Sequence, residues 1–362
     1  MKLSNLGQLI MTGISGKVLT DIESEFISNS KIGGVLLFAN NYESPTQLAE
    51  LVNSIQALRD ESPLFIAVDQ EGGRVRRFKE HLTQFPAMLE LAKTNSPKVC
   101  FTVAKIMAEE LLALGVNVNF APCCDVLTHE ENQVIGDRAF GRDAETVSKY
   151  ISSIIRGLQT NSILACAKHF PGHGATAEDS HFELPYLEKS LEELEGLELI
   201  PFVKAVKSRV EFVMMAHIRV DAFDNKLPAS LAPEAYQYLR NELRYKKIII
   251  TDDMQMEAIT KNYSVGGAAV KAIKAGADIV EYRDMNLARE AYLGLEQAVD
   301  SGELTREIVN DRSSRILETK KLNFAEYQPI FVPEVTKKLN SRGSQIFLEE
   351  ISKSIADSKT GE

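Results

Sequence analysis

The stretch Lys247-Ile-Ile-Ile-Thr251-Asp252-Asp253-Met254 (residues 247–254) joins a run of β-branched residues to a pair of carboxylates. β-branched side chains favour strands, and a short apolar run without polar alternation is typical of a strand that is buried on both faces. Both carboxylates come at the end of the run. The stretch therefore predicts a buried strand that presents an acid where the strand ends.

Seven further apolar runs of this kind occur along the chain, at Leu9–Ile14, Gly34–Phe38, Phe65–Val68, Val116–Ala121, Leu164–Ala167, Phe212–Ala216 and Asp278–Tyr282. Apolar residues at helical spacing lie between most of them, for example in Val99–Leu114, Thr146–Gln159, Leu191–Ser208 and Gly267–Ala275. Alternating strands and helices predict βαβ units with parallel pairing. Eight units favour an α/β fold, a single (β/α)8 TIM-type barrel, over an open sheet. No G-x-G-x-x-G follows the first run, which disfavours a dinucleotide-binding fold.

The pattern changes after about residue 321. Residues 323–334 contain two prolines and several aromatic residues, and residues 343–356 have the spacing of an amphipathic helix. We expect residues 1–322 to form the catalytic barrel. Residues 323–362 are expected to form a C-terminal extension, made of a linker and a helix, without a second domain.

Composition restricts the partners and the compartment. The 362 residues carry a net charge of −10, which disfavours a nucleic-acid partner because phosphate binding needs a surplus of Lys and Arg. The sequence shows neither a signal-peptide pattern nor an apolar stretch near 18 residues, so no membrane association is expected. The four cysteines form no C-x-x-C pair and are interpreted as reduced thiols. We expect a cytoplasmic monomer that acts on a small substrate.

The densest set of reactive side chains is Lys168-His-Phe-Pro-Gly-His-Gly174, followed by Asp179-Ser-His181. A metal site is one interpretation, but a proline and two glycines exclude a helix that would align His169 with His173. A loop could still bind a metal. The favoured alternative is an acid/base pair, in which the Asp179 carboxylate orients the His181 imidazole and stabilises its protonated form. Simple loop packing is the third interpretation.

Three other segments add polar groups, and two of these segments follow predicted strands. An ionised Asp252 could attack an anomeric carbon, whereas Asp253 would cap the next segment or support the site. Asp69 lies in the glycine-containing stretch of residues 68–77 and could hold sugar hydroxyls with a neighbouring arginine, although a solvated loop is equally compatible. Arg138, within residues 136–142, offers a rigid fork of donors for oxygen ligands.

Together these motifs resemble glycoside hydrolase family 3, and within it the bacterial β-N-acetylglucosaminidases of cell-wall recycling. The resemblance spans about residues 5–320 and implies Asp252 as nucleophile and His181 as acid/base, assisted by Asp179. The sugar contacts that it implies are Asp69, Arg77, Arg138, Lys168 and His169. We expect no metal or other cofactor. The implied reaction removes β-linked N-acetylglucosamine from the non-reducing ends of muropeptides, with retention of configuration.

Other functions remain open at this point. The chain could be a family 3 β-glucosidase or β-xylosidase, a phosphorolytic relative, or a sugar-binding barrel without activity. The chain contains no Trp, and long glycan grooves usually use aromatic platforms. This favours a small pocket over a polysaccharide cleft.

Overall fold

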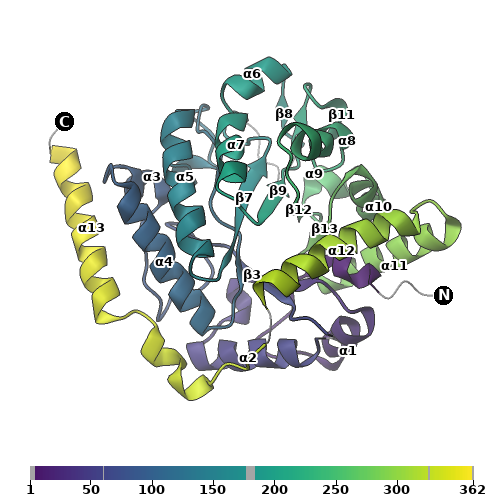
Figure 1. The fold of residues 1–362 in the computed structure, drawn as a ribbon, viewed down its shortest axis with the longest axis horizontal. Helices are drawn as coiled ribbons and strands as arrows, with labels where there is room; N and C mark the ends of the chain where they lie inside the picture. The colour runs from purple at the N-terminus through teal and green to yellow at the C-terminus, as the bar shows by residue number, and fades with distance from the viewer. Residues whose placement is uncertain (1–4, 60, 177–183, 325–326, 361–362) are drawn as a thin grey trace.

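The computed structural model describes residues 5–59, 61–176, 184–324 and 327–360. Its centre is a closed barrel of eight parallel strands (Figure 1). The strands are β1 (Ile10–Thr12), β2 (Gly34–Leu37), β3 (Phe65–Val68), β6 (Val118–Asn119), β7 (Leu164–Phe170), β9 (Phe212–Met215), β12 (Ile248–Asp253) and β13 (Ile279–Tyr282). Each pairs with its neighbour in this order, and β13 pairs with β1 to close the ring. All eight predicted strands and the (β/α)8 class are confirmed.

Helices surround this barrel (Figure 1). They are α1 (Asp21–Ser30), α2 (Pro45–Ala57), α3 (Met88–Ala92), α4 (Pro97–Ala113), α5 (Ala144–Gln159), α6 (Leu191–Gly196), α7 (Leu199–Lys207), α8 (Pro233–Gln237), α9 (Glu257–Thr260), α10 (Val265–Ala275), α11 (Met285–Ser301), α12 (Arg306–Asn323) and α13 (Arg342–Thr360). Several begin at a side-chain cap. Ser44 and Ser96, for example, each accept a hydrogen bond from the first turn, and each is followed by a proline at the first helical position.

Two predicted elements differ from the structure. The helix expected over Leu191–Ser208 is two helices, α6 and α7, separated at Leu197. Pro201 follows closely and has no N–H to donate to the carbonyl of Leu197, which is one physical reason for a break there. Strand β7 continues to Phe170, three residues beyond its predicted end, so Lys168 and His169 lie within the strand.

The barrel interior is packed with apolar side chains. Phe65 and Phe212 meet edge to face, with ring centroids 5.2 Å apart. Lys320 of α12 is buried over the Phe65 ring and donates a hydrogen bond of 2.7 Å to the side chain of Gln8. Because Phe65 begins β3, these groups close the amino-terminal end of the barrel, and the polar groups of functional interest are at the opposite end.

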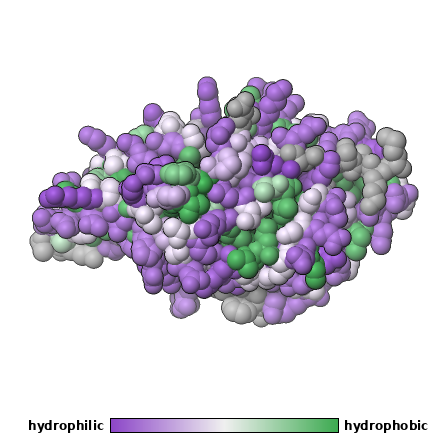
Figure 2. Space-filling view, turned by 90° about the horizontal axis from the view of Figure 1, so that it is seen from below, coloured by the Kyte–Doolittle hydropathy of each residue, from purple (hydrophilic) through white to green (hydrophobic). Residues whose placement is uncertain are grey.

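The C-terminal residues run along the outside of the barrel. The turn η5 (Val332–Lys338) packs against α2 and α4, and α13 lies beside α3 at one side of the molecule (Figure 1). Hydrophilic side chains cover most of the face in Figure 2, with hydrophobic ones in small groups among them. No helix among the described residues has both the length and the apolar character that crossing a bilayer requires.

Candidate active site

A cavity of about 490 Å³ opens at the carboxyl ends of the barrel strands. Its lining includes Leu36, Phe38, Asp69, Arg77, Phe120, Arg138, Lys168, His169, Met214, Asp252, Asp253, Glu281 and Arg283. This is the end of a (β/α)8 barrel that carries catalytic groups, because the loops after the strands converge there. Six of the residues that the sequence identified share this cavity: Asp69, Arg77, Arg138, Lys168, His169 and Asp252.

Asp69, directly after β3, is held by two cations. Its carboxylate accepts hydrogen bonds from Lys168 Nζ at 2.7 Å and from Arg77 Nη2 at 2.9 Å. Burial raises the pKa of Asp69, but the positive charges of Lys168 and Arg77 outweigh burial, so the pKa lies below its ordinary value. Asp69 is therefore an ionised, fixed acceptor at the cavity wall, suited to binding sugar hydroxyls.

Glu71 is a second buried carboxylate that the sequence analysis did not single out. Strand β4 (Gln70–Gly72) places it where Lys168 Nζ lies 2.6 Å away and where Arg138 donates through Nη2 at 2.8 Å and Nε at 2.9 Å. Burial raises its pKa, but Arg138 and Lys168 lower it well below the usual range. Glu71 thus fixes two of the predicted sugar-binding cations in position.

The glycines beside Glu71 have a structural role. Gly72 and Gly73 have positive φ angles at the turn between β4 and β5 (Val75–Arg76). A Cβ at Gly73 would lie 2.7 Å from the Cα of Ala87. These glycines thus let the hairpin turn and pack closely against Ala87.

His169 is oriented by a partner that the sequence analysis also missed. Asp125, buried in the loop after β6, accepts from His169 Nδ1 at 2.8 Å and from the His173 backbone N–H at 2.6 Å. The other ring nitrogen of His169 lies 3.2 Å from Arg138 Nη2. This network assigns the proton to Nδ1 and leaves Nε2 as an acceptor for the guanidinium. The only signal in the sequence was an acid a few residues after a predicted strand.

Among the residues that the structure describes, one group of side chains has donor types that could hold a metal. The ligand atoms of Cys123, Asp125 and His169 lie within 4.8 Å of one another. Each of these residues already has a hydrogen-bonding role, since Asp125 Oδ2 accepts from the Cys123 thiol at 3.1 Å and from the imidazole. Burial and the neighbouring Asp125 raise the pKa of the Cys123 thiol well above its ordinary value. These side chains thus already form hydrogen bonds with one another. The arrangement is suited to orienting His169.

Asp252 and Asp253 differ in environment although they are adjacent at the end of β12. Burial raises the pKa of Asp252, but His169, His217, the Asp253 N–H and Lys168 together hold it below its ordinary value. Asp253 Oδ1 instead accepts from the backbone N–H groups of Gln255 and Arg283. Burial and the neighbouring Asp252 raise the pKa of Asp253 to about 6. Asp252 is therefore the more acidic group of the pair, whereas Asp253 supports the backbone.

His217 follows β9 and lies beside this pair. Its Nε2 is 3.0 Å from the Asp253 carbonyl oxygen, and its Nδ1 is 2.7 Å from Ser230 Oγ. Since a carbonyl only accepts, Nε2 carries the proton and Nδ1 accepts from the hydroxyl. The imidazole thereby links the end of β9 to the end of β12. Asp179 and His181, the predicted acid/base pair, lie outside the described residues.

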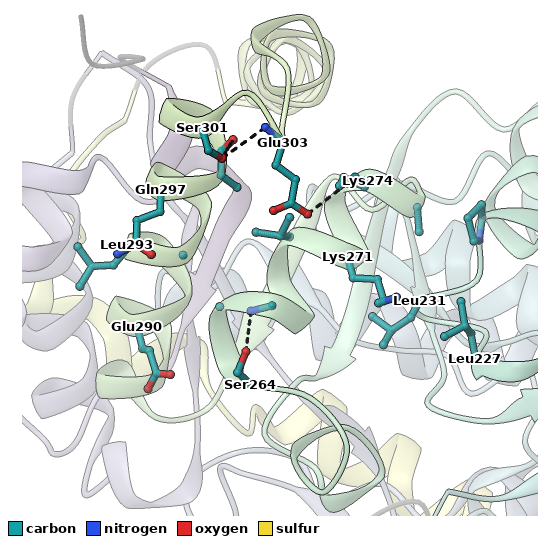
Figure 3. A pocket seen from close by; sticks show the side chains of 17 residues that line it. Leu227, Leu231, Ser264, Lys271, Lys274, Glu290, Leu293, Gln297, Ser301 and Glu303 are labelled. Atoms are coloured by element: carbon teal, nitrogen blue, oxygen red, sulfur yellow. Dashed lines mark hydrogen bonds and ion pairs between the residues drawn. The ribbon is translucent and has the colours of Figure 1, made fainter.

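A larger hollow, of about 940 Å³, lies outside the barrel between α10 and α11 (Figure 3). Its two lysines have partners of their own, since Lys274 pairs with Glu303 at 3.3 Å and Lys271 lies over the Tyr263 ring. Of the predicted site residues that the structure describes, none lines this hollow. The cavity at the strand ends is therefore the candidate active site.

Comparisons with known proteins identify the family of this chain. The profile described as the glycosyl hydrolase family 3 N terminal domain matches residues 3–319. A protein from Nitrosomonas eutropha named β-hexosaminidase is 39% identical over 306 residues, covering 82% of this chain and 87% of the relative. A β-hexosaminidase from Alkalilimnicola ehrlichii is also 39% identical, covering 76% and 80% of the two chains.

Solved structures give the same result. A family 3 β-N-acetylglucosaminidase from Paenibacillus superimposes with a TM-score of 0.89 and 34% identity, covering 97% of this chain and 68% of that one. The β-N-acetylhexosaminidase from Beutenbergia cavernae gives a TM-score of 0.82 at 26% identity, covering 88% and 97%. With a profile match over most of its length and relatives above 30% identity, the chain belongs to glycosyl hydrolase family 3.

Proposed function

We propose that this protein is a retaining exo-β-N-acetylhexosaminidase that removes β-linked N-acetylglucosamine from the non-reducing ends of peptidoglycan fragments. The observation that carries the proposal is the placement of the Asp252 carboxylate in a cavity of about 490 Å³ together with the Asp69 network. A cavity of that size suits a short saccharide. The names of the relatives support the sugar and the linkage.

The network around Lys168 would hold the sugar. Asp69 accepts from two cations and keeps acceptor capacity for hydroxyl groups, because an ionised carboxylate has about four lone-pair sites. Lys168 and Arg138 share Glu71, which keeps both donors in place before the substrate arrives. His169 is fixed by Asp125 and Arg138. Binding would thus rely on groups that are already ordered.

The chemistry then needs two displacements at one carbon. An oxygen of Asp252 attacks the anomeric carbon while the glycosidic C–O bond breaks, and the leaving oxygen takes a proton from His181. His181 next removes a proton from water, which attacks the same carbon and releases Asp252. Two inversions give net retention. Asp179 would orient His181 and stabilise its charged form.

Several finer statements belong to the same proposal. The muropeptide aglycone, the cytoplasmic location, the monomeric state and the division at residue 322 are predictions from the sequence. The four cysteines are free and buried, which is common in proteins from reducing compartments and supports the cytoplasm.

The test compares hydrolysis of the nitrophenyl β-N-acetylglucosaminide by wild type and by Asp252→Ala. We expect kcat/KM to fall at least about 10³-fold, because the nucleophile is lost. Asp300→Asn, an exposed change on α11, is the matched control and should leave the rate unchanged. NMR of the first-formed product should show the β-anomer of the sugar.

Normal turnover by Asp252→Ala, or an α-anomer as first product, would contradict the proposal. Parallel assays on the glucoside, with and without phosphate, separate it from a glucosidase and from a phosphorylase. Digestion of purified muropeptides with product analysis tests the aglycone.

A further inference from the structure

Glu281 is a buried acid in the candidate active site that neither the sequence motifs nor the proposed mechanism uses. Its side chain is 3% exposed and lines the cavity. The alternation of side chains along β13 explains why the Glu281 side chain points toward the cavity. The next residue, Tyr282, points outward and donates from its hydroxyl to the Val265 carbonyl of α10. Since adjacent strand residues face opposite sides, Glu281 points into the barrel.

The backbone fixes this residue beside the nucleophile. In the strand register Glu281 is opposite Asp253. Its N–H donates to Thr251 Oγ1 at 3.2 Å, and its carbonyl accepts from the Met254 N–H at 2.9 Å. The carboxyl group is therefore carried on the same rigid pair of strands that carries Asp252, at the wall of the cavity that would receive the sugar.

The carboxyl group itself is not satisfied by the protein. Among the described residues, Oε1 of Glu281 is buried without a hydrogen-bond partner. Buried polar oxygens are almost always paired, because leaving one unpaired loses its interaction with water without replacement. An oxygen in this state on the wall of a substrate cavity indicates that a ligand supplies the missing partner.

The charges around Glu281 determine which kind of partner fits. Burial and the carboxylates of Asp253, Asp252 and Asp69 raise its pKa well above the ordinary value, and Arg77 opposes them only in part. The raised pKa favours the protonated form of this carboxyl group. It offers one O–H donor and one carbonyl acceptor, which is the complement of a hydroxyl group.

We propose that Glu281 is a substrate-binding residue whose carboxyl group holds a hydroxyl of the sugar that Asp252 attacks. This inference rests on the proposed function for the identity of the sugar. The proposed sugar contacts described above come from Asp69 after β3, from β7 and from Arg138. Glu281 adds a contact from β13, so that the sugar would be held from both sides of the nucleophile.

The test uses Glu281→Leu and Glu281→Gln, assayed on the nitrophenyl N-acetylglucosaminide. Leucine has a similar size but cannot hydrogen-bond, so kcat/KM should fall roughly 10- to 100-fold, mainly through KM. Glutamine keeps a neutral donor and an acceptor and should stay within about threefold of wild type. Glu110→Gln alters an equally buried carboxyl on α4, outside the cavity, and controls for stability effects.

Deoxy substrates locate the contact. The 3-, 4- and 6-deoxy N-acetylglucosaminides each lack one hydroxyl. The loss of kcat/KM in Glu281→Leu should disappear on the one analogue that lacks the hydroxyl held by Glu281. An unchanged KM in Glu281→Leu would overturn the inference, as would equal damage by glutamine and leucine. A penalty that persists on all three analogues would overturn it as well. If wild type hydrolyses no glycoside, the proposed function fails, and calorimetric binding of N-acetylglucosamine to the two variants still tests Glu281.

Discussion

Replacing Glu71 by glutamine should weaken both the fold and the site. The residue is 4% exposed, and its carboxylate neutralises two buried cations through contacts of 2.6, 2.8 and 2.9 Å. Glutamine keeps the shape but removes the charge and turns an NH2 group toward one cation. Breaking a buried ion pair on one side typically costs about 3–5 kcal/mol, because the remaining charge stays buried without compensation. We expect the free energy of unfolding to fall by that amount at pH 7.

This loss can be measured as a melting shift. An unfolding entropy of about 2.1 cal/mol/K per residue gives about 0.76 kcal/mol/K for the whole chain, so the Tm should fall by roughly 4–7 °C. Glu130→Gln is the matched control, since Glu130 pairs with Arg142 at 3.3 Å on the exposed surface. Surface pairs contribute little, and that variant should melt within about 1 °C of wild type.

The stability that Glu71 contributes should decrease at low pH. The pKa of Glu71 is lowered in the folded state, so its stabilising effect is complete above the unfolded pKa of about 4.3 and is lost as the pH falls below that value. The difference in the free energy of unfolding between wild type and Glu71→Gln should therefore be constant from about pH 6 to 8 and become smaller at acidic pH. Calorimetry at these pH values checks both statements. Equal melting of Glu71→Gln and Glu130→Gln at pH 7 would refute the reasoning.

Two further substitutions test the remaining buried charges. Asp253→Asn should raise the free energy of unfolding at pH 7 by up to about 2–3 kcal/mol. The folded pKa of about 6 exceeds the unfolded one, so wild type loses stability as the pH rises from about 4 to 6. A gain that persists unchanged at pH 4 in denaturant titrations would contradict this. Burial lowers the pKa of Lys320 to about 7, so Lys320→Met should stabilise the protein by about 1–4 kcal/mol at pH 7, with the advantage shrinking as the pH rises toward about 10. A melting series from about pH 7 to 10 checks it, and a stability difference that grows with pH would be the opposite of the expectation.

The strand pattern and the polar residues at strand ends were readable from the sequence because they are local properties. A run such as Ile248–Thr251 specifies a buried strand by its side chains alone, and eight such runs with helices between them leave few alternatives to a barrel. The barrel in turn predicts that Asp69, Lys168 and Asp252 meet at one end, which the cavity confirms. The break within Leu191–Ser208 was missed because helical spacing of apolar residues continues across it.

The sequence by itself therefore determined the barrel and the cavity residues at its strand ends, whereas the tertiary structure decided how those residues are charged and oriented. Asp125 meets His169 across 44 residues of chain, and Glu71 meets Arg138 across 67. Each acid lies a few residues after a predicted strand, but the sequence does not say which side chain it meets. A pKa and a hydrogen bond depend on burial and on charges within a few ångströms, and these distances are fixed only when the barrel closes and brings separate loops together.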